Sequence, residues 1–181
     1  CDAGAEYALY ASDITRTGPV SGTFSTAQRA LYEVVLAAQT ESIRAARVGV
    51  PYEAIHATAV AVLTEGLLSL GLLKGALKKN IETETYKTFY MHKTGHWLGL
   101  DVHDVGEYKL GGKSRQLEPG MVFTVEPGLY IAPGTPGVPA KYQGIGIRIE
   151  DDILMTKNGP ENLTSGVPVS ADAIEALMAK P

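Results

Sequence analysis

The sequence predicts a single α+β domain in which helices pack on one face of a curved antiparallel sheet. Its length of 181 residues suits one domain. The first half contains two segments in which apolar residues recur at helical spacing. The second half contains short β-rich runs separated by glycine and proline. A hydrophobic content of 45% and a charged content of 20% are ordinary for a folded chain, so disorder is not expected.

Local signals predict the elements of the first half. Residues 6–17 are rich in aromatic and β-branched side chains and are followed by Gly-Pro, which predicts a hairpin. Ser25 and Gln28 have the spacing of a capping box, and helical spacing of apolar residues continues to about residue 47. A second helix is predicted over residues 51–71, because proline suits a first helical turn and glycine suits a helix end.

The second half is predicted to consist mainly of strands. Residues 72–90 are rich in lysine and threonine, and we expect a loop there. Short apolar runs predict strands at residues 121–125, 129–131 and 145–155, with a proline-marked surface excursion between the second and third. Residues 171–179 follow a serine cap and predict a closing helix.

The composition excludes several classes of protein. With a net charge of −4 and a pI near 5.6, the chain has no basic surface to hold phosphates, so a nucleic-acid partner is not expected. The longest mostly apolar stretch, residues 54–73, contains His56 and Glu65, so no membrane span is expected. A single cysteine excludes an intrachain disulfide and fits a reducing compartment, which favours the cytoplasm.

The chain begins at Cys1, not at methionine, and we expect the natural N-terminus to lie upstream. An alternative is a self-processed hydrolase in which Cys1 is the nucleophile and its own α-amino group activates the thiol. The chemistry inferred from the rest of the sequence does not need Cys1.

Three histidines, His92, His96 and His103, fall within twelve residues. The first two stand four apart, as in the zincin helix, but that motif needs a glutamate after the first histidine. Here Lys93 follows, and Gly95 disfavours a helix, so a zincin is excluded. Histidines that only cap loops or lie satisfied in a core are the alternative interpretation.

Acidic residues occur where strands are predicted. Glu126 ends a β-rich run and is followed by Pro-Gly, which fixes a turn at the carboxylate. In residues 144–150, alternation places three isoleucines on one face and Arg148 and Glu150 on the other. A solvated Arg–Glu pair is the alternative here.

Two further acids, Asp2 and Asp13, belong to the predicted hairpin. Their odd separation would place them on opposite faces of one continuous strand, so a bend or bulge is needed for both to face one site. Taken separately, each aspartate is better explained as a turn cap.

Together these residues offer one imidazole and four carboxylates to one concave face. Like charges this close are unfavourable unless divalent cations compensate them, and two such ions cancel about four negative charges. A carboxylate-rich set with one histidine suits Mn²⁺, with Co²⁺ or Zn²⁺ as alternatives. A pair of ions would bridge a water and deliver hydroxide to a carbonyl, so hydrolysis is predicted. The proposed ligands are Asp2, Asp13, His96, Glu126 and Glu150.

Four motifs follow one another along the chain: DAGAEY with DITRT, GHWLGLDVHDVG, LEPGMVFTVEPGLY and GIGIRIEDD. In this order they resemble the catalytic domain of aminopeptidase P. That family is one of the pita-bread metallopeptidases, with prolidase, methionine aminopeptidase and the non-metal creatinase. The resemblance covers essentially all of residues 1–181 and implies the pita-bread fold and the five metal ligands given above.

The resemblance also assigns roles around the metal ligands. It implies that Glu126 helps to deprotonate the bridging water, and that His92 and His103 hydrogen-bond the substrate and the tetrahedral intermediate. Arg148 and Tyr130 match positions that orient the substrate or support the ligands.

The predicted function is hydrolysis of the Xaa-Pro bond at peptide N-termini. Prolidase, which accepts only dipeptides, is the alternative, and a non-catalytic binding module of the same fold is a second one. The resemblance implies a homo-oligomer that acts on peptides with proline in second position. It also implies that this chain is the C-terminal portion of the catalytic domain. The preceding portion would be a separate chain or lost, leaving the fragment weakly active or inactive.

Overall fold

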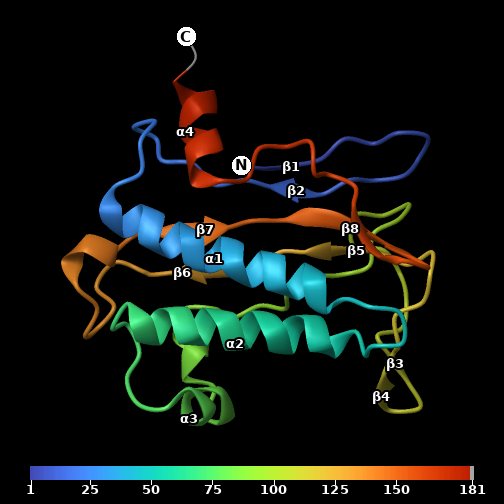
Figure 1. Cartoon of the computed structure of the whole chain (residues 1–181), viewed down its shortest axis with the longest axis horizontal. Helices are drawn as coiled ribbons and strands as arrows, with labels where there is room; N and C mark the ends of the chain where they lie inside the picture. Colours follow the sequence, from blue (N-terminus) through green and yellow to red (C-terminus); the bar gives the residue numbers. More distant parts are fainter. Residues whose placement is uncertain (180–181) are drawn as a thin grey trace.

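A computed structural model describes residues 1–179 of the chain and shows helices on one side and strands on the other (Figure 1). The first half contains the hairpin strands and the long helices, and the second half contains most of the strands. In chain order the elements are β1 (Asp2–Ala3), β2 (Ile14–Thr15), α1 (Thr26–Ala45), α2 (Glu53–Ser69), α3 (Leu77–Glu82), η1 (Thr85–Thr88), β3 (Lys109–Leu110), β4 (Lys113–Ser114), β5 (Val122–Val125), β6 (Gly128–Tyr130), η2 (Ala140–Tyr142), β7 (Gly146–Arg148), β8 (Asp151–Thr156), β9 (Gly159–Asn162) and α4 (Ala171–Met178).

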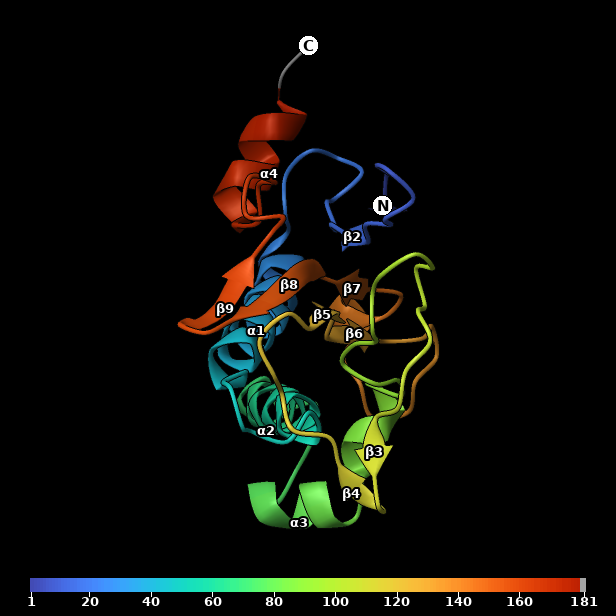
Figure 2. The same ribbon diagram turned by 90° about the vertical axis from the view of Figure 1, so that its right-hand side faces the viewer.

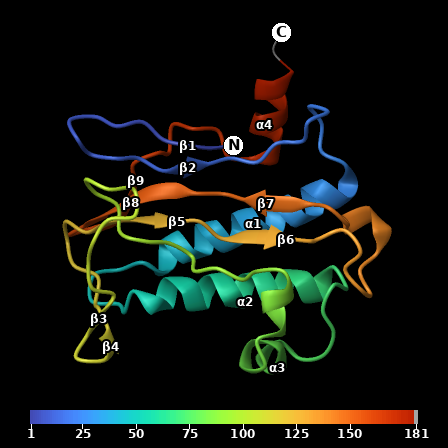
Figure 3. The same ribbon diagram turned by 180° about the vertical axis from the view of Figure 1, so that it is seen from behind.

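The strands form a bent antiparallel ribbon. β5 pairs with β8, and β6, which follows β5, pairs with β7, which precedes β8. The segment β5–β6 therefore runs antiparallel to the segment β7–β8. β9 extends the ribbon on the far side of β8, and a bridge between Thr15 and Glu150 attaches the β1–β2 hairpin. Figure 3 shows this ribbon in front of the two long helices.

The helices cover one face of the ribbon. α1 and α2 lie side by side, and their apolar side chains pack with those of β6 and β7 in one core (Figures 1 and 2). The fully buried side chains of this core include Leu31, Val35, Leu63, Leu129 and Ile147. The opposite face of the ribbon is therefore left for polar groups. The predicted α+β architecture is confirmed.

Both predicted long helices are confirmed. Ser25 caps α1 as expected, because its side chain accepts a hydrogen bond from the Gln28 N–H while the Gln28 side chain accepts from the Ser25 N–H. The predicted hairpin is present, but its first strand, β1, precedes the expected range of residues 6–17. Residues 7–10 form the turn, with Ala8 and Leu9 in the left-handed region.

Two predictions were wrong in detail. Residues 72–90 are not simply a loop, because they contain α3 and η1. Asn80 organises this segment by donating to the carbonyls of Lys74 and Ala76, and Tyr90 is buried. The run at 145–155 is two strands, because the chain bends where Glu150 turns its buried side chain toward Thr15.

Within residues 1–179, none of the helices combines the length and apolar character needed to cross a membrane.

The contact between α1 and α2 depends on Gly66. A Cβ atom at this position would lie 2.3 Å from Cγ1 of Val34. We expect Gly66→Ala to lower the free energy of unfolding by about 1–3 kcal/mol, because overpacking outweighs the better helix propensity of alanine. Urea unfolding measures this. Adding Val34→Ala should recover stability relative to Gly66→Ala alone, and a stabilising Gly66→Ala variant would contradict the expectation.

Candidate metal centre

Glu126 directly follows β5, in the short connection that leads into β6. Its backbone N–H donates to the Thr94 carbonyl at 2.7 Å, which ties the strand end to the segment before His96. The Thr124 hydroxyl lies 3.4 Å from Oε1 of Glu126. The carboxylate is therefore held by its strand on one side and by the histidine-bearing segment on the other.

His96 is held against β5 by a pair of backbone contacts. The Thr124 N–H donates to the His96 carbonyl, and the His96 N–H donates to the Thr124 hydroxyl. Gly95 allows this close approach, because a Cβ atom there would lie 1.9 Å from the Thr124 carbonyl oxygen. The zincin reading stays excluded, since His92 and His96 are not on a helix.

The ring of His96 is oriented for metal binding. Nδ1 lies 2.9 Å from the Trp97 carbonyl, which can only accept, so Nδ1 carries the proton and Nε2 presents a lone pair. Nε2 is buried and has no hydrogen-bond partner among residues 1–179. It lies 3.3 Å from Oδ2 of Asp13 and 3.6 Å from Oε1 of Glu126. An orphaned imidazole nitrogen facing two carboxylates fits a divalent cation.

The other three acids complete the cluster. Asp2 lies on β1 and Asp13 directly precedes β2, so they come from opposite arms of the hairpin, and the bend or bulge that a continuous strand would need is not required. Glu150 is buried and accepts a 2.6 Å hydrogen bond from the Thr15 hydroxyl. The hairpin thus brings the start of the chain to the β7–β8 bend.

The carboxylates and His96 form two overlapping sets of three potential ligand atoms, each set within 4.8 Å. One set joins Asp2, Asp13 and Glu150, and the other joins His96, Glu126 and Glu150. Glu150 belongs to both sets, so the two sets are contiguous. The five residues proposed from the sequence therefore converge on one place.

Burial makes this cluster unfavourable without cations. It raises the pKa of Glu126 to about 7 and that of Glu150 to about 8, although the Thr15 hydrogen bond opposes the shift at Glu150. Burial also raises the pKa of Asp13, and the neighbouring Asp2 raises it further. Divalent cations would relieve the repulsion between these carboxylates.

The remaining predicted residues surround the cluster. His103 is exposed, and its ring centroid lies 4.3 Å from that of His96, so it also offers a nitrogen beside Asp13. Nδ1 of His92 donates to the Lys93 carbonyl, which leaves Nε2 to accept from the Tyr130 hydroxyl at 2.8 Å. His103 is therefore open to a substrate, whereas both ring nitrogens of His92 already have partners and the Tyr130 hydroxyl oxygen is the atom of this pair that is left to accept.

Arg148 lies beside the acidic cluster on β7. Its Nη2 lies 2.6 Å from Oδ2 of Asp2, and its Nε donates to the Thr15 hydroxyl. The guanidinium therefore orients Asp2 and lowers the pKa of Glu126 against the larger effect of burial.

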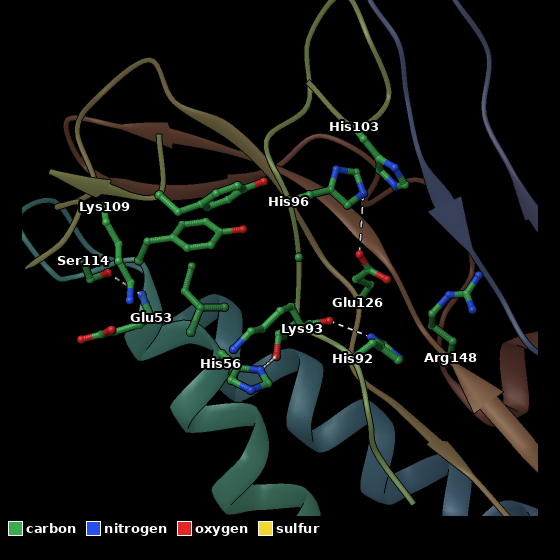
Figure 4. A pocket seen from close by; sticks show the side chains of 15 residues that line it. Glu53, His56, His92, Lys93, His96, His103, Lys109, Ser114, Glu126 and Arg148 are labelled. Atoms are coloured by element: carbon green, nitrogen blue, oxygen red, sulfur yellow. Dashed lines mark hydrogen bonds and ion pairs between the residues drawn. The ribbon is translucent and has the colours of Figure 1, made fainter. Parts of the chain in front are cut away.

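A pocket of about 650 Å³ opens next to the cluster (Figure 4). His96, His103 and Glu126 lie together at one end, while α2 contributes His56 to another part of the wall. Cys1, the alternative nucleophile, is exposed and does not line this pocket.

Sequence reasoning missed the groups that hold the ligands. Thr15 and Thr124 bond ligand side chains or backbone, and the Asp152 carboxylate accepts from the Asp13 N–H at 3.1 Å. Each of these residues lies two positions from a proposed ligand. This closeness in the sequence is the one signal that could have found them.

A carboxylate cluster with one correctly oriented histidine is a donor set that can bind divalent cations. Residues 1–157 match the profile of metallopeptidase family M24. The chain belongs to this family.

The known proteins that this chain resembles include Xaa-Pro aminopeptidases from bacteria and from humans. The chain is 52% identical over 177 residues to an Xaa-Pro aminopeptidase of Escherichia coli, covering 98% of this chain and 40% of that protein. It is 38% identical to Xaa-Pro aminopeptidase 3 of Homo sapiens, covering 97% and 34%. The chain thus spans well under half the length of these curated relatives.

Solved structures agree with this assignment. The structure of Pseudomonas aeruginosa aminopeptidase PepP superposes with a TM-score of 0.97 at 55% identity, covering 98% of this chain and 40% of the other. Zinc-substituted E. coli aminopeptidase P in complex with product gives 0.93 at 52% identity, with the same coverage. The resemblance to aminopeptidase P and the pita-bread fold expected from the sequence are confirmed.

We expect Gly95→Ala to lower divalent-metal affinity by at least about tenfold, because the added methyl group pushes the His96 segment away from β5. Titration calorimetry with Mn²⁺ measures the affinity. Gly166→Ala is the matched control, since a Cβ atom there meets nothing within 4 Å. Equal affinities for the two variants would contradict the role given to Gly95.

The raised carboxyl pKa values predict an unusual pH dependence of stability in chelator. Glu126 and Glu150 have folded-state pKa values of about 7 and about 8, above the ordinary 4.5. Their contribution to stability is therefore present below about pH 4.5 and lost as pH rises through 7 to 8. We expect the metal-free chain to lose on the order of a few kcal/mol across this window.

Thermal unfolding between pH 5 and 8.5, with EDTA or with Mn²⁺, tests this expectation. The metal should remove most of the loss, and Glu150→Gln should reduce the pH dependence in EDTA because glutamine stays neutral, leaving the part due to Glu126. A metal-free stability that rises steadily over the same range would count against the expectation.

Proposed function

We propose that the protein containing this chain is a metal-dependent Xaa-Pro aminopeptidase, which removes the residue before a proline in second position. One observation carries the proposal: two overlapping ligand sets share Glu150 beside a pocket large enough for a peptide. The names of the relatives support the same activity. They favour it over the prolidase and binding-module alternatives.

In this proposal the five ligands hold two divalent ions. When bound, such ions lower the pKa of a water molecule and polarise the scissile carbonyl. Mn²⁺ is the proposed metal, because carboxylate oxygens dominate the set and a single imidazole completes it. The hairpin, β5 and the β7–β8 bend supply the ligands Asp2, Asp13, His96, Glu126 and Glu150.

The surrounding side chains bind the peptide and move a proton. Glu126 lies at the end of the pocket beside His96, where its carboxylate takes a proton from the attacking water and can return it to the leaving nitrogen. His103 is exposed beside His96 and donates to the carbonyl that becomes the oxyanion. His92 and Tyr130 form one hydrogen-bonded unit that orients the substrate, and Arg148 orients Asp2.

The rest of the expected biology is part of the same proposal. The tertiary amide before proline has no N–H, so a peptidase that does not bind this group is needed to cleave it. The single cysteine supports a cytoplasmic location, and the resemblance supports a homo-oligomer. Residues 1–181 are proposed to be the C-terminal portion of the catalytic domain, weakly active or inactive without the preceding portion.

The test uses the full-length protein, because the chain spans about 40% of its relatives. We expect X-Pro-Y-Z peptides to be cleaved after X, with loss of activity in EDTA and recovery with Mn²⁺. X-Ala-Y-Z peptides are the control. Glu126→Gln should lower kcat on the order of a thousandfold.

The alternatives give different results in the same assay. Cleavage of X-Pro dipeptides without cleavage of longer peptides would identify a dipeptidase. Metal binding without any hydrolysis would identify a binding module. Loss of activity with thiol reagents, independent of metal, would point to Cys1.

A further inference from the structure

The His103 loop, residues 98–104, is a compact segment closed by contacts between its own ends. The Asp104 N–H donates to the Trp97 carbonyl at 3.0 Å, which closes the loop at its base. A Cβ atom on Gly99 would lie 2.0 Å from Oδ2 of Asp104, so the two ends of the loop are packed against each other. The position of Gly99 therefore affects that of Asp104, the residue that follows His103.

The β1–β2 hairpin donates two hydrogen bonds to this loop. The Tyr10 hydroxyl donates to the Leu98 carbonyl at 3.0 Å. The Ala11 N–H donates to the Gly99 carbonyl at 2.8 Å. Leu98 and Gly99 are buried, so carbonyls left without a donor there would be unfavourable. Burial and the negative charge of Asp104 raise the pKa of Tyr10, which keeps its hydroxyl protonated and able to donate.

The turn that delivers Tyr10 to the loop is strained. Tyr7 and Tyr10 exchange two backbone hydrogen bonds of 3.0 Å, and the two residues between them, Ala8 and Leu9, have φ values of 50° and 69°. A two-residue turn with positive φ at both central positions is normally built from glycine and asparagine. Strain of this kind persists where surrounding contacts impose it. The two bonds to the His103 loop are such contacts.

The same hairpin arm meets the loop a second time, at His103. Asp13 lies three residues after Tyr10, and one ligand atom each from Asp13, His96 and His103 lie within 4.8 Å of one another. The His103 ring centroid is 4.3 Å from that of His96, and the two rings stand together at one end of the pocket (Figure 4). Residues 10–13 therefore join the arm that carries a proposed metal ligand to the loop that carries an exposed imidazole.

We propose that Tyr10 is a positioning residue for His103: its hydroxyl holds the His103 loop against the hairpin, so that the imidazole is kept beside the metal ligands and meets the carbonyl under attack. The inference rests on the proposed function, in which His103 donates to the oxyanion. Tyr10 acts through the loop and does not itself touch the substrate.

The kinetic test removes only the Tyr10 hydroxyl from the full-length, Mn²⁺-loaded protein. Tyr10→Phe should lower kcat for X-Pro-Y-Z peptides about three- to tenfold, the factor of one neutral hydrogen bond. KM should change less than kcat, because the oxyanion forms only in the transition state. Tyr7→Phe is the matched control, since Tyr7 belongs to the same turn and its side chain is 88% exposed.

Titration with Mn²⁺ separates an effect on His103 from an effect on the metal ligands. Tyr10→Phe should leave the metal affinity unchanged, because the Asp13 backbone is held independently by the Asp152 carboxylate. A loss of affinity as large as the loss of kcat would overturn the proposal, since Tyr10 would then act on the ligands.

A double-mutant cycle tests whether Tyr10 acts through His103. In a His103→Ala background, Tyr10→Phe should have little further effect on kcat, because the group that it positions is absent. The same three- to tenfold loss in both backgrounds would overturn the proposal, since the effects of independent residues are additive.

Hydrogen exchange provides a measurement that does not depend on activity. In the metal-loaded protein, Tyr10→Phe should increase the exchange rate of the amides of residues 99–104 about three- to tenfold, whereas Tyr7→Phe should not. Unchanged exchange in Tyr10→Phe would overturn the proposal even if kcat fell. Absence of hydrolysis of every Xaa-Pro peptide by the unmodified protein would instead overturn the proposed function, and the role of His103 with it.

Discussion

The structure depends on placing four carboxylates and one imidazole in a small, partly buried space. Burial raises the pKa of Glu150 to about 8, although this residue accepts a hydrogen bond from Thr15. A folded chain carrying such a group is under electrostatic stress at neutral pH. Divalent cations bound here would relieve this stress, which would link metal binding thermodynamically to the folding of this region.

The scaffold around the cluster keeps the ligands in place. Arg16 forms a salt bridge of 2.7 Å with the buried Asp151 and donates to the carbonyls of Thr15 and Glu150. It therefore ties β2 to the start of β8 from behind the ligands. Gly95 and Thr124 hold the His96 segment against β5. The rigid ribbon and its two long helices position a site whose own groups repel one another.

Several elements could be predicted from local sequence. The capping box at Ser25 and the helical spacing after it predicted α1 correctly, because these signals depend on residues close together in the sequence. Glu126 could be placed at a strand end, because Pro-Gly follows it. Residues 72–90 were misjudged, since Asn80 and the buried Tyr90 organise them through contacts that local composition does not reveal.

The sequence by itself determined the α+β class, the two long helices and the identity of the five candidate ligands, because periodicity and residue chemistry are local properties. Only the tertiary structure decided that Asp2 and Asp13 reach the site from opposite arms of the hairpin, and that Glu150 is shared by two ligand sets. It alone fixed the tautomer of His96, because a ring proton is set by the acceptor that folding brings to it.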